Sequence, residues 1–221
     1  MSDLVPGTVY SLSEIEAHAK KAVRGAGFAW GYAEEAGKAV RLLAAHQLPG
    51  AIVLAAYLTE RAADSGFSGP VVSGEAWSAV EPTQALCPVL SGAVFCDHAR
   101  AVVKEGSHVL LTELAYPLLV LPYMALLSRR LDCSLQISWD GVELTLHQGR
   151  LTLLANEGDA LQTGRAERFS CRSITVEDAG QEAGNSGQVI SDEIWLALNE
   201  FAYRTYVPAT EASRRGAGPA D

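Results

Sequence analysis

Four side chains in the middle of the chain are of types that can carry out chemistry. They are Cys87, Asp97, His98 and Glu113, and an uncharged run ending at Cys96 separates the first from the others. A thiol becomes a nucleophile when an imidazole or a helix N-terminus lowers its pKa. Two carboxylates can act as general acid and base, with a histidine as a proton carrier. These four residues are therefore the candidate catalytic residues.

Each of these residues also has a structural interpretation. Free cysteine is among the most buried residue types and packs as a small hydrophobe. Asp97 and Glu113 can cap an element or pair with an arginine. Cys96 and His98 could share one face of a strand as metal ligands, but the cysteines show no C-x-x-C spacing and no second ligand pair follows. The sequence therefore predicts no metal and no cofactor.

Candidate substrate-binding residues lie near the C-terminus. Arg204 and Arg214 belong to a segment that also carries tyrosine, valine and proline. Guanidinium groups bind carboxylates and phosphates through two parallel hydrogen bonds. The segment can fold back over the body, or over a neighbouring subunit, and cover a pocket. The alternative is a disordered tail after Thr210.

The element that must position the thiol and its neighbours is the run from Leu86 to Cys96. It carries no charge, and a strand buried on both faces shows no polar alternation. We therefore expect a buried strand whose end brings Asp97 and His98 to the edge of the core, where functional sites are usually built. The stretch 66–82, rich in Gly, Ser and Pro, is expected to be a connection.

The first third of the chain is predicted to be helical, with helices at about 11–26, 30–47 and 50–64. Ser11 and Glu14 have the spacing of a capping box, and Gly25 and Gly27 supply a stop. Apolar residues recur at helical spacing. Short connections favour antiparallel neighbours packed against one another.

Strand signals dominate after residue 133. Segments 134–139, 142–146 and 151–154 alternate or are apolar, with Asp140-Gly141 and Gln148-Gly149 as turns between them. A fourth strand at 169–176 would complete an antiparallel meander with one dry face.

Three further elements are expected around this meander. A strand is predicted at 109–112, and a helix is predicted to begin at Pro117 or Pro122 and to end at Arg130. The pair Arg129-Arg130 would complement the dipole of that helix. A last amphipathic helix is expected at about 192–203.

Helices followed by a mostly antiparallel sheet are the pattern of an α+β fold. We expect an N-terminal helical layer packed on a mainly antiparallel sheet, with a C-terminal helix and tail. The 221 residues are expected to form a single domain over 1–221. Its helical part covers about 11–65, its mixed and sheet part about 71–207, and its tail 208–221.

Composition limits the partners. A net charge of −9 argues against nucleic acid, which requires clustered basic residues. The apolar stretch Leu114–Leu127 is too short to span a membrane, and the N-terminus shows no secretory signal. We therefore expect a cytoplasmic protein with reduced cysteines. The many apolar residues in 116–127 lead us to expect a homodimer, since leftover apolar surface marks subunit contacts.

Two functions from different classes fit these residues. The first is an enzyme that metabolises a small molecule, hydrolase- or isomerase-like, with a thiol or carboxylate site. The second is a non-catalytic metabolite-binding protein or an accessory subunit of a metabolic enzyme. The enzyme requires its reactive groups to converge in one pocket, and the accessory protein requires an exposed apolar patch.

Seven short segments form a recognisable pattern: Ser11–Glu16, Arg24–Gly27, Trp30–Gly37, Cys87–Gly92, Tyr206–Pro208, Ser213-Arg214 and Gly216–Gly218. They resemble an uncharacterised family of proteobacterial proteins that is described only as a domain of unknown function. The resemblance covers nearly the whole chain and implies one unit of about 220 residues, but no activity and no catalytic residues.

Overall fold

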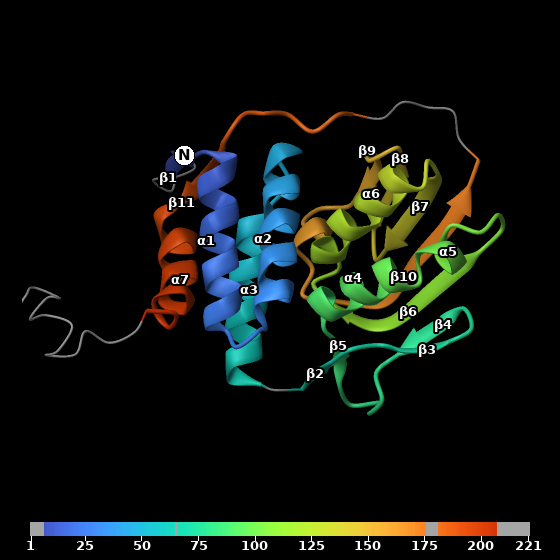
Figure 1. Ribbon diagram of the computed structural model, residues 1–221, viewed down its shortest axis with the longest axis horizontal. Helices are drawn as coiled ribbons and strands as arrows, with labels where there is room; N and C mark the ends of the chain where they lie inside the picture. The colour runs from blue at the N-terminus through green and yellow to red at the C-terminus, as the bar shows by residue number, and fades with distance from the viewer. Residues whose placement is uncertain (1–6, 65, 176–180, 207–221) are drawn as a thin grey trace, which may run out of the picture.

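The computed structural model describes residues 7–64, 66–175 and 181–206 and confirms the α+β class (Figure 1). A helical layer lies beside a second part in which two helices cover one face of a sheet. The helical layer consists of α1 (Leu12–Gly25), α2 (Trp30–Ala45), α3 (Gly50–Ala63) and α7 (Asp192–Tyr203). The two covering helices are α4 (Pro88–Asp97) and α6 (Leu121–Arg130). Buried residues of both parts form one hydrophobic cluster.

Helix α1 begins with the predicted capping box. The Ser11 side chain accepts a hydrogen bond from the Glu14 backbone N–H, and the Ser11 N–H donates to the Glu14 carboxylate at 2.9 Å. At its other end Gly25 lies against α7, because a Cβ there would stand 1.8 Å from the carbonyl oxygen of Phe201. Backbone contact therefore packs α1 directly against α7.

A two-stranded sheet that the sequence did not indicate reinforces this junction. Strands β1 (Gly7–Tyr10) and β11 (Gln188–Ser191) pair antiparallel. The ring of Trp195 on α7 stacks on Tyr10, with centroids 3.6 Å apart, and on His18 of α1 at 3.9 Å. The pairing is invisible locally because its partners are about 180 residues apart in the sequence.

The main sheet has the strand order β2-β5-β6-β10-β7-β8-β9, and β4 pairs with both β3 and β6. Its meander runs through β7 (Ser134–Trp139), β8 (Val142–His147) and β9 (Arg150–Asn156), as predicted. The other strands are β2 (Phe67–Ser68), β3 (Val71–Ser73), β4 (Ala76–Ser78), β5 (Ala85–Leu86), β6 (His108–Ala115) and β10 (Arg165–Ile174). The expected connection at 66–82 therefore contains three short strands.

The predicted fourth strand of the meander has a different place. Strand β10 does not extend the meander beyond β9 but lies between β6 and β7, antiparallel to both. A neighbouring strand lies on each side of β10, and its inward side chains, such as Phe169 and Cys171, are buried. Strand order depends on which edges can be covered, and the alternation of one strand does not contain that information.

The expectation of a buried strand at 86–96 is wrong, because this segment forms helix α4. Pro88 occupies the first turn, where its missing N–H costs nothing, and the Cys87 side chain caps the helix by accepting from the Leu90 N–H. The segment has no polar face because the helix is covered by α2, α6 and the 3₁₀ helix η1 (Pro117–Val120). Burial on several sides looks the same in sequence for a strand and a short helix.

The apolar segment before Arg130 folds as predicted, with an extended approach, η1 and then α6. Its large side chains, including Leu118, Leu121, Tyr123 and Met124, are buried within the chain's own core. The apolar surplus that suggested a homodimer is thus hidden inside one copy. No helix in the described ranges is both long enough and apolar enough to cross a membrane.

Candidate functional site: a cationic cleft between α2 and α6

The thiol of Cys87 is buried at the N-terminus of α4. Its Sγ lies 3.0 Å from the Tyr57 hydroxyl, and the Leu90 N–H points toward it at 3.5 Å. Burial raises the pKa of the Cys87 thiol, and these hydrogen bonds oppose the shift only in part. The thiol form therefore dominates near neutral pH, which suits a packed side chain better than a nucleophile.

The other candidate catalytic residues lie apart from this thiol. Asp97 and His98 are exposed at the far end of α4, about 15 Å of helix away from Cys87. The His98 ring packs edge-on against Trp77 at 5.8 Å. Glu113 belongs to β6, where its φ of 55° marks an irregular position, and its carboxylate pairs with Arg165 at 3.5 Å. The structure does not bring these groups together.

The two predicted substrate-binding arginines are placed differently. Arg204 follows α7, and its guanidinium lies over the Phe201 ring at 4.4 Å. Arg214 lies outside the described residues. Among the described residues, no group of three or more His, Cys, Asp or Glu side chains is arranged to hold a metal ion.

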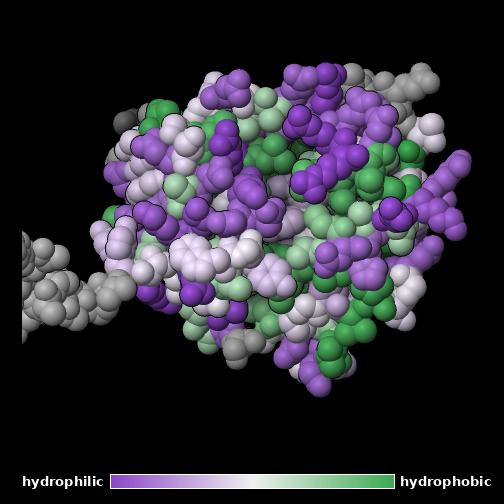
Figure 2. All heavy atoms as spheres, in the orientation of Figure 1, coloured by the Kyte–Doolittle hydropathy of each residue, from purple (hydrophilic) through white to green (hydrophobic). Residues whose placement is uncertain are grey.

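A cleft of about 700 Å³ opens between α2 and α6. Figure 2 shows hydrophilic residues on both sides of a hollow at this place, with hydrophobic residues visible inside it. Its apolar lining includes Leu12, Leu42, Pro122 and Leu126. None of Cys87, Asp97, His98, Glu113 and Arg204 is among the described residues that line it.

Basic residues from three elements line this cleft. Lys38 and Arg41 come from α2, Arg129 and Arg130 from the end of α6, and Arg150 from the start of β9. Against these five cations, two carboxylates are found in the described lining, those of Glu35 and Glu182. The cleft thus carries an excess of positive charge in a chain whose net charge is −9. Such a concave cationic surface attracts anions.

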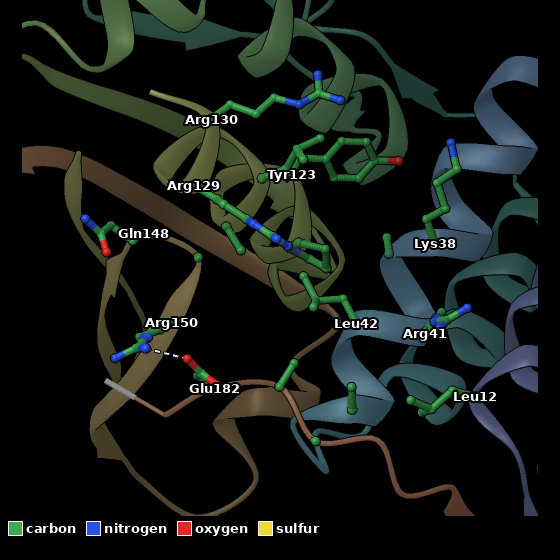
Figure 3. Close-up of a pocket in the computed structure, with 18 of the residues that line it drawn as sticks. Leu12, Lys38, Arg41, Leu42, Tyr123, Arg129, Arg130, Gln148, Arg150 and Glu182 are labelled. Carbon is green, nitrogen blue, oxygen red and sulfur yellow. Dashed lines mark hydrogen bonds and ion pairs between the residues drawn. The ribbon is translucent and has the colours of Figure 1, made fainter. Parts of the chain in front are cut away.

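The Tyr123 side chain forms part of the α6 wall. It is 5% exposed, and its hydroxyl has no hydrogen-bond partner among the described residues. In Figure 3 this hydroxyl points from α6 toward α2. A buried hydroxyl without a partner costs about 1–3 kcal/mol. Its oxygen is closed off from solvent, so the hydroxyl belongs to the packing behind the cleft wall.

Gly92 of α4 sets the position of this tyrosine. A Cβ at residue 92 would lie 2.4 Å from the Tyr123 ring, so only glycine leaves room for the ring. Burial raises the pKa of the Tyr123 hydroxyl well above its usual value. The hydroxyl is therefore protonated at neutral pH and can donate a hydrogen bond.

The turn between β8 and β9 holds the end of α6. Gln148 and Gly149 both have positive φ, 49° and 80°, as a tight two-residue hairpin turn requires. The Gly149 N–H donates to the Ser128 hydroxyl at 3.3 Å, and that hydroxyl donates to the Cys133 carbonyl at 2.7 Å. The Ser128 hydroxyl thus links the end of α6, which carries Arg129, to the hairpin turn and to Cys133.

Residues 181–187 join the sheet side to the helical side along the cleft. Gln181 exchanges two backbone hydrogen bonds with Leu151, and Glu182 pairs with Arg150 (Figure 3). The Gly184 N–H then donates to the carbonyl oxygen of Ala45, at the end of α2, at 2.9 Å. This segment connects the two walls.

A second, shallower depression of about 510 Å³ lies on the solvent face of the main sheet. Its lining includes His108, whose Nε2 is 2.9 Å from the Ser170 hydroxyl. Arg168, Glu143 and Glu157 also line this depression. Side chains of both charges lie there, as on an ordinary solvated sheet face.

Reasoning from the sequence missed most of the cleft residues. The sequence predicted Arg129 and Arg130 as partners of a helix dipole, and Arg129 also as an ion-pair partner for a carboxylate. It did not single out Lys38 and Arg41. The spacing of Lys38 and Arg41 places them on one face of α2. Nothing local indicates that this face meets the end of α6, some 90 residues later in the chain.

The comparisons with known proteins agree with the expected resemblance. Residues 10–100 match the family described as protein of unknown function DUF3726. The resemblance to a domain of unknown function is thus confirmed, and it brings no activity. The matched region contains the α2 wall of the cleft and ends before the α6 wall begins.

No curated protein matches this chain. A solved structure that resembles it is the crystal structure of malate dehydrogenase from Entamoeba histolytica, with 9% sequence identity and a TM-score of 0.45. The similarity covers 94% of this chain and 72% of that one. At this level the likeness supports no functional conclusion.

Proposed function

We propose that this protein binds a small organic anion in the cleft between α2 and α6. The observation that carries the proposal is that five basic residues from three elements line one cavity of an acidic chain. The cavity of about 700 Å³ falls in the size range of small-molecule sites. Its apolar lining suits the carbon skeleton of a metabolite, and the guanidinium groups suit its carboxylate or phosphate.

A hydrolase- or isomerase-like enzyme remains a second proposal. It would require Cys87 or the Asp97/Glu113 carboxylates to reach a bound substrate. The burial of Cys87, its raised pKa and the absence of these groups from the described cleft lining support the binding function more strongly.

A thermal-shift titration tests anion binding. Citrate and inorganic phosphate are added at constant ionic strength, balanced with sodium chloride, so that general screening does not change. A ligand at a hundred times its Kd adds about 2.7 kcal/mol of stability. For a chain of this size that corresponds to a rise in Tm of roughly 5–10 °C.

The double variant Arg129→Gln/Arg130→Gln should abolish the saturable rise in Tm. Its matched control is Arg100→Gln/Lys104→Gln, which removes two positive charges from exposed positions outside the cleft. The control should keep the response. No saturable response to either anion, or equal loss in both variants, would overturn the proposal.

We also propose the homodimer and the cytoplasmic location that the sequence predicts. The segment that motivated the dimer is buried in one copy, so exposed aromatic residues such as Tyr203 and Tyr206 are now the best support for self-association. Sedimentation of the full chain measures it directly.

A further inference from the structure

The ion pairs of the cleft leave two of its cations unpaired. Lys38 pairs with Glu35 at 2.7 Å, and Arg41 turns to Glu16 of α1 at 2.9 Å. Arg150 pairs with Glu182. Within the described residues Arg129 and Arg130 have no carboxylate and no hydrogen-bond partner. The charge available to a ligand is therefore that of two exposed arginines that are adjacent in the sequence.

Both arginines extend from the last turn of α6 toward α2, and in the view of Figure 3 the Tyr123 ring lies between them. The α6 backbone at this point is held by the hairpin turn, since a Cβ on Gly149 would lie 3.0 Å from Cβ of Arg129. The carbonyl end of a helix stabilises positive charge. The end of α6 therefore stabilises Arg129 and Arg130 without a carboxylate partner.

Tyr123 belongs to the same wall as this pair of charges. Tyr123 and Arg130 are seven residues apart on α6, which places them on the same face of the helix. The hydroxyl oxygen of Tyr123 is closed off from solvent, so the exposed Arg129 and Arg130, rather than this hydroxyl, meet a ligand. The apolar part of the cleft, with Leu42, Pro122 and Leu126, begins beside them.

We infer that the ligand of this cleft carries a compact group with two negative charges, bound between Arg129 and Arg130, on an apolar body. The inference rests on the proposed anion-binding function and specifies its ligand class. A phosphate monoester and a geminal dicarboxylate share this chemistry, because both present two charges within the reach of adjacent guanidinium groups. A monocarboxylate satisfies only one of them.

Isothermal titration with three probes of similar alkyl length tests the charge count. Butyl phosphate and propylmalonate are dianions at about pH 8, since the second phosphate pKa is about 6, and pentanoate is a monoanion. Hydrogen bonds to an ionised group are roughly twice as strong as those between neutral groups. We therefore expect at least one dianion to bind the wild-type protein about tenfold or more tightly than pentanoate.

Single variants assign the two charges. Arg129→Gln and Arg130→Gln should each reduce the dianion preference by about tenfold, whereas Arg100→Gln, an exposed site on α5 (Ala99–Val102), should leave it unchanged. Circular dichroism confirms that each variant is folded.

The outcomes separate this inference from the proposed function. Equal binding of all three probes, lost in the Arg129→Gln variant, would keep the anion site and overturn the two-charge ligand. A preference unaffected by either single variant would overturn the assignment to this arginine pair. If none of the three probes binds, the proposed function itself is overturned. The better of the two dianions identifies the source as phosphate or dicarboxylate.

Discussion

Single residues decide the shape of the cleft wall, and Gly92 is the clearest example. The Tyr123 ring occupies the space that a side chain at residue 92 would fill, with 2.4 Å between a new Cβ and the ring. Gly92→Ala should lower the free energy of unfolding by about 1–3 kcal/mol, because the overpacking outweighs the better helix propensity of alanine. Chemical denaturation measures the change.

Gly31→Ala is the matched control for Gly92→Ala. Gly31 also lies in a helix, but a Cβ added there would meet no atom within 4 Å. The substitution should be neutral or stabilising by up to about 1 kcal/mol. A Gly92→Ala variant as stable as Gly31→Ala would show that Tyr123 is not held as described.

Thiol reactivity gives a second test at this scale. Burial raises the pKa of all four cysteines, that of Cys171 to about 12. In the native protein, half-buried Cys96 and Cys133 should react with iodoacetamide before buried Cys87 and Cys171, since the thiolate is the reactive form. Peptide mass mapping of a time course measures the order.

The unfolded protein, prepared without reductant, should yield four free thiols, as the reduced state of the described cysteines implies. Rapid alkylation of native Cys87 would contradict its structural role and strengthen the proposal of a thiol enzyme.

Elements fix the cleft by holding one another, and the turn at Gly149 is the contact that positions the end of α6. Gly149 has φ of 80° and a Cβ there would lie 3.0 Å from Cβ of Arg129. Gly149→Ala should therefore lower the free energy of unfolding by about 1–2 kcal/mol. Urea denaturation provides the measurement.

Gly106→Ala separates the two causes in that prediction. Gly106 also has positive φ, 75°, but nothing lies within 4 Å of its Cβ position. It carries only the backbone strain, so it should lose less stability than Gly149→Ala. Equal losses in the two variants would mean that the turn does not press on α6.

Elements also show where prediction from sequence worked. The helices α1, α2 and α7 were predicted almost to the residue, because each has one apolar stripe and clear ends. Helix α4 was predicted as a strand because it has no stripe at all. A periodicity argument needs a solvent face, and α4 has little of one.

The stability of the whole molecule should depend on pH at both ends of the range. Burial lowers the pKa of His18 and His46, so both are neutral when folded and take up protons when unfolded, near pH 6.5. Their contribution is complete above that pH and is lost as the pH falls through the lower, folded pKa. The free energy of unfolding should therefore decrease between about pH 7 and 5.

His46→Gln should weaken this decrease, and His147→Gln, at a half-buried position on β8, serves as the comparison. At alkaline pH the signs reverse. Burial raises the pKa of Cys87 and Tyr123 in the folded protein. Their contribution to the free energy of unfolding is therefore complete at neutral pH, and it is lost as the pH rises above the pKa values of these groups in the unfolded chain. A flat profile from about pH 5 to 11 would contradict both assignments.

The sequence alone determined the α+β class, the limits of most helices and the β7–β9 meander. These features depend on residues close together in the chain, such as the capping box at Ser11 and the turn at Gln148-Gly149. Only the tertiary structure decided that β10 lies between β6 and β7 and that 88–97 is helical. It also decided that α2 and the end of α6 face one another across a cationic cleft. Side chains about 90 residues apart meet there because the core brings their helices together, and no local pattern records that contact.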